Sequence, residues 1–230
     1  MVPSTGFSIP ASTPNLSAGS SAVAGATLSS IDPFRHDSLR RPTVDAIIDK
    51  EFLRILGSHD RMHEVASVYF SSISIRIPIL SEKRFRKRLP SALSPKRDAE
   101  FAALCLCVYL VLEIPQPGDE TMQSSLYVSV KSILSLLEAT SFRSLEAVQC
   151  RVLVAFYEVG HGIYPAAAVS VGACAKLAQV LGLRREIPSF EYGDESDIVA
   201  EERRRTWWAL HNLDRYDTHR EGISSTVDSN

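Results

Sequence analysis

The sequence predicts an all-α fold, a multi-helix bundle or array that follows a disordered N-terminal tail. From Val44 onward, apolar residues recur at intervals of three and four, which places their side chains on one face of a helix. Ser, Thr, Asp or Pro residues precede many of these segments, and Gly or Pro residues follow them, as at helix ends. No segment shows the alternation of apolar and polar residues that is typical of a half-buried strand.

The N-terminal segment is predicted to be disordered. Residues 1–31 contain no charged side chain and are rich in Ser, Ala, Pro, Gly and Thr. Such a segment buries too little apolar surface to offset the entropy that an ordered chain loses. We therefore expect a tail and linker over 1–42, a helical domain over 43–220 that is incomplete at its C-terminal end, and a polar tail over 221–230.

The predicted helices follow one another with short connections. Their expected ranges, taken from caps and stops, are 43–57, 60–78, 81–90, 95–112, 119–137, 144–160, 165–182 and 201–216. Thr43, Asp60 and Ser144 are among the expected caps. The helix over 95–112 is apolar on nearly every side, which is typical of a buried central helix. The helix over 165–182 is rich in Ala and Gly, so we expect a neighbouring helix to approach it closely.

The helix over 201–216 is the most informative segment of the chain. Two acids lie in its first turn, where the positive end of the helix dipole favours them. Glu201 precedes Arg205 by four residues, a spacing that favours an ion pair. An apolar stripe at helical spacing is expected to face the core, and its members are Thr206, Ala209, Leu210, Leu213 and Tyr216.

Both tryptophans of the chain lie side by side in this helix. Arg203 precedes Trp207 by four residues, and Arg204 precedes Trp208 by the same four, so a guanidinium group can lie over each indole ring. We interpret the tryptophans as an anchor of the core, not as part of a reactive site.

This helix resembles one in the middle homology region of fungal zinc-cluster transcription factors, where the pattern E-x-R-R-R-x-W-W-x-L-x-x-L-D-R recurs. The matching signature residues are Arg203, Arg204, Arg205, Trp207, Trp208, Leu213, Asp214 and Arg215. Two upstream parts agree with the family in order. Phe70, the Ile-Pro-Ile-Leu run over 77–80 and Phe85 resemble its opening element, and 176–185 resembles a later step.

The resemblance implies a nuclear protein whose helical domain regulates RNA polymerase II genes, those of metabolism among them. Such a domain modulates an attached DNA-binding module through intramolecular contacts, other transcription factor chains, co-regulators or a small-molecule effector. One alternative is a cluster-free interaction protein or decoy that binds related transcription factors. Another is a small-ligand-binding helical protein with a pocket beside the helix over 165–182.

The zinc cluster of the resembled family is not expected in this chain. Such a cluster needs six thiolates in two closely spaced groups around two zinc ions. Here Cys105, Cys107, Cys150 and Cys174 lie within apolar segments, and we interpret them as reduced core thiols. No cofactor is therefore expected, and promoter DNA would be reached only through a module missing from this chain. We expect a truncated family member or an incomplete gene model.

A second metal candidate is the pair His59 and His63, which has the spacing of two zinc ligands on one helix. No third ligand is evident beside the pair. Asp60 is interpreted as a helix cap, which would leave His59 just outside the helix. We therefore do not expect zinc at this position.

A basic tract lies in the helix predicted over 81–90. Its five cations are Lys83, Arg84, Arg86, Lys87 and Arg88. A solvated helix face is one interpretation, and a nuclear-import tract is the other. The family resemblance makes Phe85, which lies within the tract, a core residue.

Composition and motifs argue against other function classes. The net charge of −2 and the isoelectric point of about 6.3 argue against a chain that binds polyanions as a whole. No nucleophile elbow, phosphate-binding glycine loop or dinucleotide fingerprint occurs, so we do not expect an enzyme. The longest apolar run, 101–112, has 12 residues, whereas a membrane span needs about 20.

Overall fold

The structure is a computed structural model that describes residues 37–92, 94, 98–115, 121–140, 143–184 and 194–221. For 37–43, 194–195 and 217–221 it describes the backbone alone. The chain divides into two compact units, Met1–Arg35 and His36–Asn230, and all described residues belong to the second unit. Of the predicted tails over 1–42 and 221–230, residues 1–36 and 222–230 lie outside the described residues.

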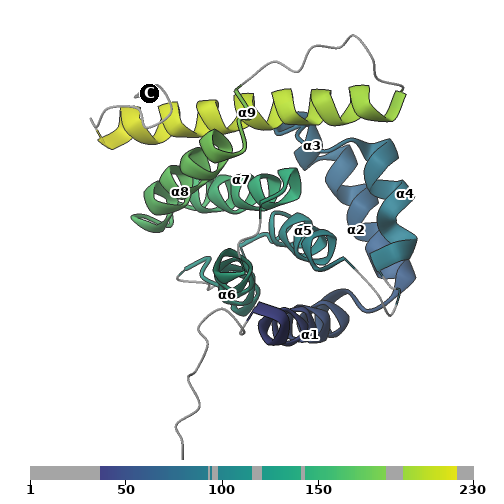
Figure 1. Cartoon of the computed structure of the whole chain (residues 1–230). Helices are drawn as coiled ribbons and strands as arrows, with labels where there is room; N and C mark the ends of the chain where they lie inside the picture. The colour runs from purple at the N-terminus through teal and green to yellow at the C-terminus, as the bar shows by residue number, and fades with distance from the viewer. Residues whose placement is uncertain are drawn as a thin grey trace, which may run out of the picture. The chain divides into compact units, whose positions relative to one another are not determined.

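The described residues form helices and no strand, which confirms the predicted fold class (Figure 1). In chain order the helices are α1 (Asp37–Leu56), α2 (His59–Ser71), α3 (Ile73–Arg76), α4 (Glu82–Ala92), α5 (Ala99–Leu110), α6 (Ser125–Ala139), α7 (Leu145–Gly160), α8 (Ala166–Val180) and α9 (Asp194–Glu221).

The first helix starts earlier than predicted. α1 begins at Asp37 and not at Thr43, so 37–42 is helical where the sequence predicts a linker. Proline lacks the N–H group that the interior of a helix uses, which is why Pro42 predicts a boundary. In α1 the missing N–H group of Pro42 removes a single backbone hydrogen bond close to the N-terminal end of the helix.

The helix predicted over 60–78 has a different cap and is broken in two. Ser58 is the N-cap of α2, since its backbone is extended and its Oγ accepts a hydrogen bond from the Arg61 N–H at 3.2 Å. Asp60, the predicted cap, lies in the first turn. At the other end, the Ser72 hydroxyl donates to the Val68 carbonyl at 2.5 Å, and α3 starts after this residue. Such side-chain bonds compete with the helical ladder.

Two other predicted helix ends agree with the structure, whereas α4 continues through Pro90, its predicted end, to Ala92. Ser144 caps α7, with its Oγ accepting a hydrogen bond from the Ala147 N–H at 3.1 Å. Gly182 follows α8 with a φ of +61°, a left-handed conformation that glycine adopts without a steric penalty. The last helix, by contrast, starts at Asp194, well before the predicted 201.

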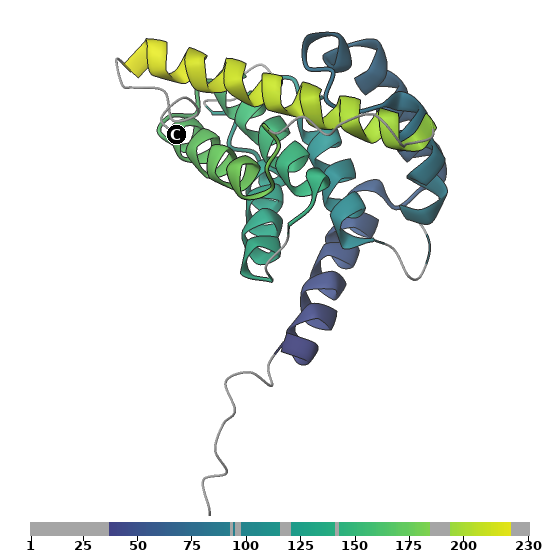
Figure 2. The same ribbon diagram turned by 45° about the horizontal axis from the view of Figure 1, so that its top comes forward.

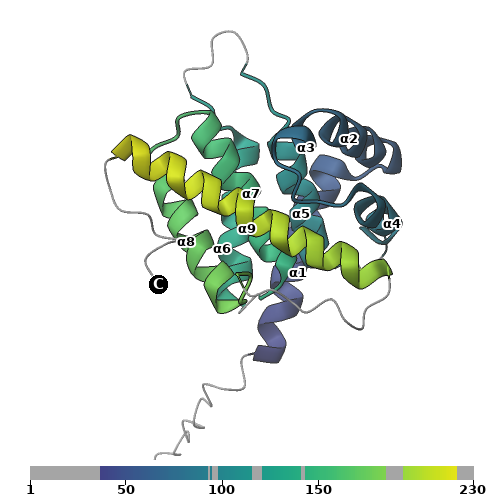
Figure 3. The same cartoon turned by 90° about the horizontal axis from the view of Figure 1, so that it is seen from above.

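The core centres on α5 and α7. Nearly every residue of α5 from Phe101 to Leu110 is buried, which confirms the predicted central helix. α5 packs against α1, α2, α6 and α7, while α7 packs against α8 and α9. α1 and α9 lie on opposite sides of this pair, as Figures 1 and 2 show. The long helix α9 crosses α8 and α7 and reaches α4 at its N-terminal end (Figure 3).

The four cysteines are buried and none is in a disulfide. Burial raises the pKa of the Cys174 thiol to about 12, so this thiol stays protonated and unreactive. The burial of all four agrees with their interpretation as core thiols. Over the described ranges, no helix combines the length and the apolar character that a membrane crossing requires.

Candidate functional site

The N-terminal part of α9 is joined to α4 and α7 by one guanidinium group. Nη1 of Arg84 lies 2.5 Å from Oε2 of Glu202, and its Nη2 lies 2.6 Å from Oε1 of Glu146. Glu202 Oε1 also accepts a hydrogen bond from the backbone N–H of Ser81 at 2.7 Å. Arg84 therefore links three helices that are distant in the sequence.

A second arginine of the basic tract extends this network. Arg88 donates from Nη1 to Glu146 Oε1 and from Nη2 to Asp98 Oδ2, each at 2.7 Å. Its guanidinium carbon also lies 4.4 Å from the ring centroid of Phe101. Asp98 is the N-cap of α5, so Arg88 connects α4 with the central helix.

The two carboxylates of the network have pKa values that shift in opposite directions. Burial alone would raise the pKa of Glu146, but its own backbone hydrogen bond and the charges of Arg84 and Arg88 outweigh burial and lower it. At Glu202 burial prevails, and its pKa is raised despite the bonds from Ser81 and Arg84. Glu146 is consequently the more strongly stabilised anion of the two.

The rest of the basic tract lies on the outer side of α4. Arg86 donates from Nε to Glu82 at 2.8 Å, and its guanidinium lies 5.9 Å from the ring centroid of Phe70. Lys83 and Lys87 are exposed. Since all three arginines make ion pairs within the domain, the tract is in large part structural. Its role in nuclear import stays a prediction.

The signature arginines of α9 have partners that the sequence predicts only in part. Arg205 lies 2.6 Å from Glu201, which confirms the predicted ion pair, and Arg204 binds the same carboxylate at 2.7 Å. Arg203 instead donates to the carbonyl oxygens of Leu181 and Gly182, at 3.2 and 3.3 Å. It thus satisfies orphan carbonyls where α8 ends.

These bonds replace the predicted stacking of Arg203 and Arg204 on the tryptophans. Among the described residues, the cation–ring contacts are made by Arg61, Arg86 and Arg88. The spacing of four residues permits such stacking, but a carboxylate and two carbonyl oxygens bind the guanidinium groups instead.

The tryptophans do not share one environment, which corrects their joint interpretation as core residues. Trp207 is half-buried and packs against the core, whereas Trp208 is 52% exposed and contacts His211 edge-to-face. Neighbouring residues on a helix point about 100° apart, so both cannot face the same core.

The predicted apolar stripe of α9 is correct in its first part. Thr206, Leu210 and Leu213 are buried, and Ala209 packs partly against the core. Tyr216 is 58% exposed, because the stripe turns away from the core toward the C-terminal end. Of the remaining signature residues, Asp214 is buried and Arg215 is exposed.

Trp208 lines a groove of about 660 Å³ between α9, α7 and the segment after α3. Its apolar lining consists of Ile77, Pro78, Phe156, Val159, Gly160, Trp208, Ala209, Leu213 and Tyr216, and its polar lining of Arg76, Arg204, Arg205 and Asn212. Among the residues with described side chains, the charged ones that line it are therefore all arginines. We call it the Trp208 groove.

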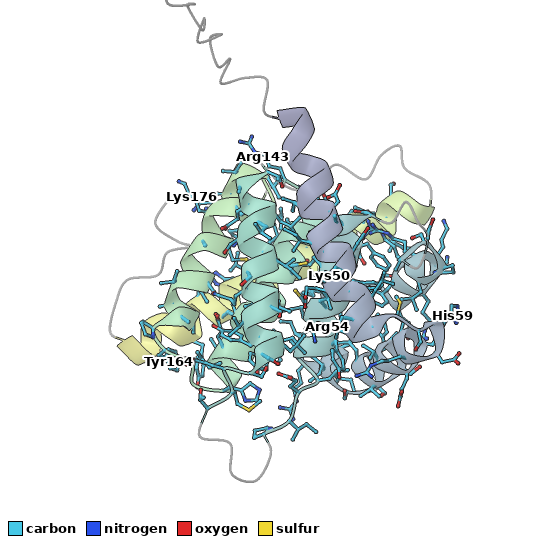
Figure 4. The ribbon with its side chains drawn as sticks, turned by 90° about the horizontal axis from the view of Figure 1, so that it is seen from below. Lys50, Arg54, His59, Arg143, Tyr164 and Lys176 are labelled. Carbon is cyan, nitrogen blue, oxygen red and sulfur yellow. The ribbon has the colours of Figure 1, made fainter. Side chains whose placement is uncertain are left out.

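A second groove of about 450 Å³ lies between α6 and α8, over α7. Its floor is apolar, and Arg143, Lys176 and the ion pair of Arg151 with Glu138 lie at its rim. Figure 4 shows Arg143 and Lys176 on the same side of the helical unit. The sequence predicts a pocket beside the small-residue helix, and this groove has that position.

The histidine pair forms no metal site with other described residues. Nε2 of His59 lies 3.2 Å from Nε2 of His63, but no group of three His, Cys, Asp or Glu side chains suited to a metal occurs in the described part of the chain. His59 lies on the outer side of α2 (Figure 4).

Buried carboxylates are the residues that sequence reasoning missed. Besides Glu146, α7 carries the fully buried Glu158, whose Oε1 accepts a hydrogen bond from the Tyr127 hydroxyl at 2.6 Å and lies 2.9 Å from Lys131 Nζ. Both acids stand within a largely apolar segment. An acidic residue among apolar ones could have indicated these ion pairs, because a buried acid requires a cationic partner on another helix.

In comparison with known proteins, the chain matches the family model of the fungal specific transcription factor domain over residues 66–229. A transcription factor of Botryotinia fuckeliana is 36% identical over 170 residues, which are 74% of this chain and 92% of that protein. No solved structure matches the chain.

Two longer relatives match over a smaller share of their length. A pigment biosynthesis transcriptional activator of Monascus ruber is 28% identical over 176 residues, covering 70% of this chain and 30% of that protein. An azaphilone cluster-specific transcription factor of Aspergillus niger is 27% identical over 169 residues, covering 68% and 36%. The chain thus spans about a third of these two relatives.

Proposed function

Because the chain belongs to the fungal specific transcription factor domain family, we propose that it regulates RNA polymerase II genes of a biosynthetic cluster in the nucleus. The observation that carries this proposal is the 36% identity with a protein named as a transcription factor, of which the match covers 92%. The longer relatives, named for pigment and azaphilone clusters, support genes of specialised metabolism as the targets.

The chemistry of the two grooves supports binding rather than catalysis. Their described linings combine apolar side chains with guanidinium and ammonium groups, and the one carboxylate, that of Glu138, is paired with Arg151. Nucleophilic catalysis would need a nucleophile within hydrogen-bond reach of a base, and general acid–base catalysis would need a titratable side chain positioned to exchange a proton with the substrate. We therefore propose that the chain acts by binding co-regulators or other transcription factor chains.

Contact with promoter DNA is proposed to pass through another module. The net charge of −2 gives this chain little attraction for phosphates as a whole. In this proposal the zinc belongs to such a module, and the present chain needs no cofactor. The signature residues of α9 then have a structural role: Arg203 fixes this helix to the end of α8, next to Glu202, which fixes it to α4.

A second candidate function is that of a cluster-free interaction protein or decoy for related transcription factors. It is favoured by the Botryotinia fuckeliana protein, since a match that covers 92% of it leaves room for little beyond the helical domain. In this case the chain would lower the activity of a DNA-binding relative by occupying its partner surface.

Transcript profiling of the source fungus, with the gene deleted and then overexpressed, tests both functions. We expect coordinated changes in the genes of one biosynthetic cluster. Arg84→Ala, which breaks the link between α4, α7 and α9, should abolish the response, and Arg86→Ala, which breaks a largely exposed ion pair on the same helix, is the matched control. A fall in these transcripts on overexpression identifies the decoy. Unchanged transcripts despite normal protein accumulation would contradict both functions.

A further inference from the structure

We propose that the Trp208 groove binds an acidic amphipathic helix of a partner protein. The proposal assigns a partner class to the regulator described above, but it rests on the surface of the chain alone. It follows from three properties of the groove, which are its exposed aromatic residues, the sign of its charges and the geometry of its walls.

The first property is the exposure of large aromatic side chains. Trp208 and Tyr216 are 52% and 58% exposed although both line an apolar groove. Tryptophan, tyrosine and arginine are the residues most enriched among those that dominate the binding energy of protein interfaces. All three residue types occur together in the lining of the Trp208 groove.

The second property is charge of one sign. Arg76, Arg204 and Arg205 line the groove, and no carboxylate of the residues with described side chains does. Arg204 and Arg205 share the single carboxylate of Glu201, while Arg76 is exposed and makes no ion pair with any described residue. The rim therefore carries more positive charge than its own neighbours neutralise, which favours carboxylates on the partner.

The same charge argues against a second copy of the chain as the occupant. A symmetric dimer that buries this groove would bring the arginines of one copy toward those of the other. Like charges placed together across an interface disfavour such pairing. An acidic partner meets no such repulsion.

The third property is the shape of the groove. Its walls are the helices α9 and α7, and Ile77 and Pro78 line it beside them. An extended peptide that adds a strand needs a sheet edge, and the described part of the chain contains no strand. An apolar groove between helices instead matches an amphipathic helix, whose anchors recur at three and four residues.

A designed peptide of roughly 15 residues, long enough for a marginal isolated helix, is the probe. It carries Leu and Phe at helical spacing with Glu on both flanks, and fluorescein reports its binding to the full chain by anisotropy. Two control peptides have Gln in place of each Glu, or the same composition with the apolar spacing scrambled. We expect both controls to bind at least about tenfold more weakly.

Variants of the chain locate the site. Trp208→Ala and Arg76→Glu should each weaken binding by at least about tenfold. Arg143→Glu is the matched control, because Arg143 is also exposed but lies at the groove between α6 and α8, and it should leave the affinity unchanged. Circular dichroism and the thermal midpoint establish that each variant is folded.

Several outcomes would overturn the proposal. Equal affinity for the Glu and Gln peptides would show that the groove does not select an acidic partner. Equal losses of peptide affinity in Arg76→Glu and Arg143→Glu would indicate unspecific electrostatic attraction. A concentration-dependent dimer that Trp208→Ala abolishes would assign the groove to a second copy. Each of these results leaves the transcript experiment unaffected, so failure of this proposal and failure of the regulator function are distinguishable.

Discussion

Arg84 of α4 binds Glu202 of α9 at 2.5 Å across 118 positions of the sequence. Glu202 lies in the tryptophan helix, next to the signature arginines, and only about 4% of its surface is exposed. The pair therefore places the family signature against the opening part of the domain. A cation in the basic tract thus has a defined structural role.

Replacing Arg84 with alanine should destabilise the domain strongly. The variant leaves Glu202 without a cation and Glu146 with Arg88 alone, and breaking a buried pair in this way costs about 3–5 kcal/mol. Urea unfolding followed by circular dichroism measures the loss. Arg86→Ala is the matched control, because its pair with Glu82 is largely exposed and worth about 0.3–0.5 kcal/mol. Equal losses in the two variants would show that the Arg84 network contributes little.

The stability contributed by Glu146 should depend on pH in the acid range. Its pKa in the folded chain is lowered from the ordinary value of 4.5, so the unfolded chain binds the proton more readily. The contribution is full above pH 4.5 and is lost as the pH falls through the lowered pKa. We expect the difference in unfolding free energy between the native chain and Glu146→Gln to shrink in that window.

Glu202→Gln provides the comparison, because its pKa shifts the other way. With the pKa raised in the folded chain, stability falls as the pH rises from the ordinary toward the raised value. The difference between native chain and variant should therefore change in the opposite direction with pH. Parallel pH profiles for the two variants would rule out the assigned shifts.

The sequence predicted the helices better than the partners of their polar residues. Apolar spacing and capping residues are local features of the sequence, and they sufficed to predict the central helix α5 and the N-cap at Ser144. The pairing of Arg84 with Glu202 depends on how α4 and α9 pack, which no local pattern contains. The Trp208 groove was missed for the same reason, since Phe156 and Arg76 reach it from separate helices.

The two tryptophans should differ in their contribution to stability. Trp207→Ala removes a side chain that packs against the core, and we expect a loss of about 3 kcal/mol, the lower end for such changes. Trp208→Ala should cost about 0.5 kcal/mol, as for other surface positions. Thermal and urea unfolding of both variants decide the point. A large loss of unfolding free energy in Trp208→Ala would show that Trp208 is a core residue and would weaken the case for an exposed binding surface.

Nuclear accumulation should not depend on the exposed lysines of the basic tract. An import receptor has to reach several cations of one segment, yet Arg84 and Arg88 are bound to Glu202, Glu146 and Asp98 within the domain. We expect the full chain fused to a fluorescent protein to show the same nuclear fraction with and without Lys83→Ala and Lys87→Ala. The matched control replaces Lys50 and Lys176, which are exposed on α1 and α8. A loss of nuclear signal in the tract variant alone, at unchanged stability, would establish α4 as the import tract and would require its arginines to leave their carboxylates on receptor binding.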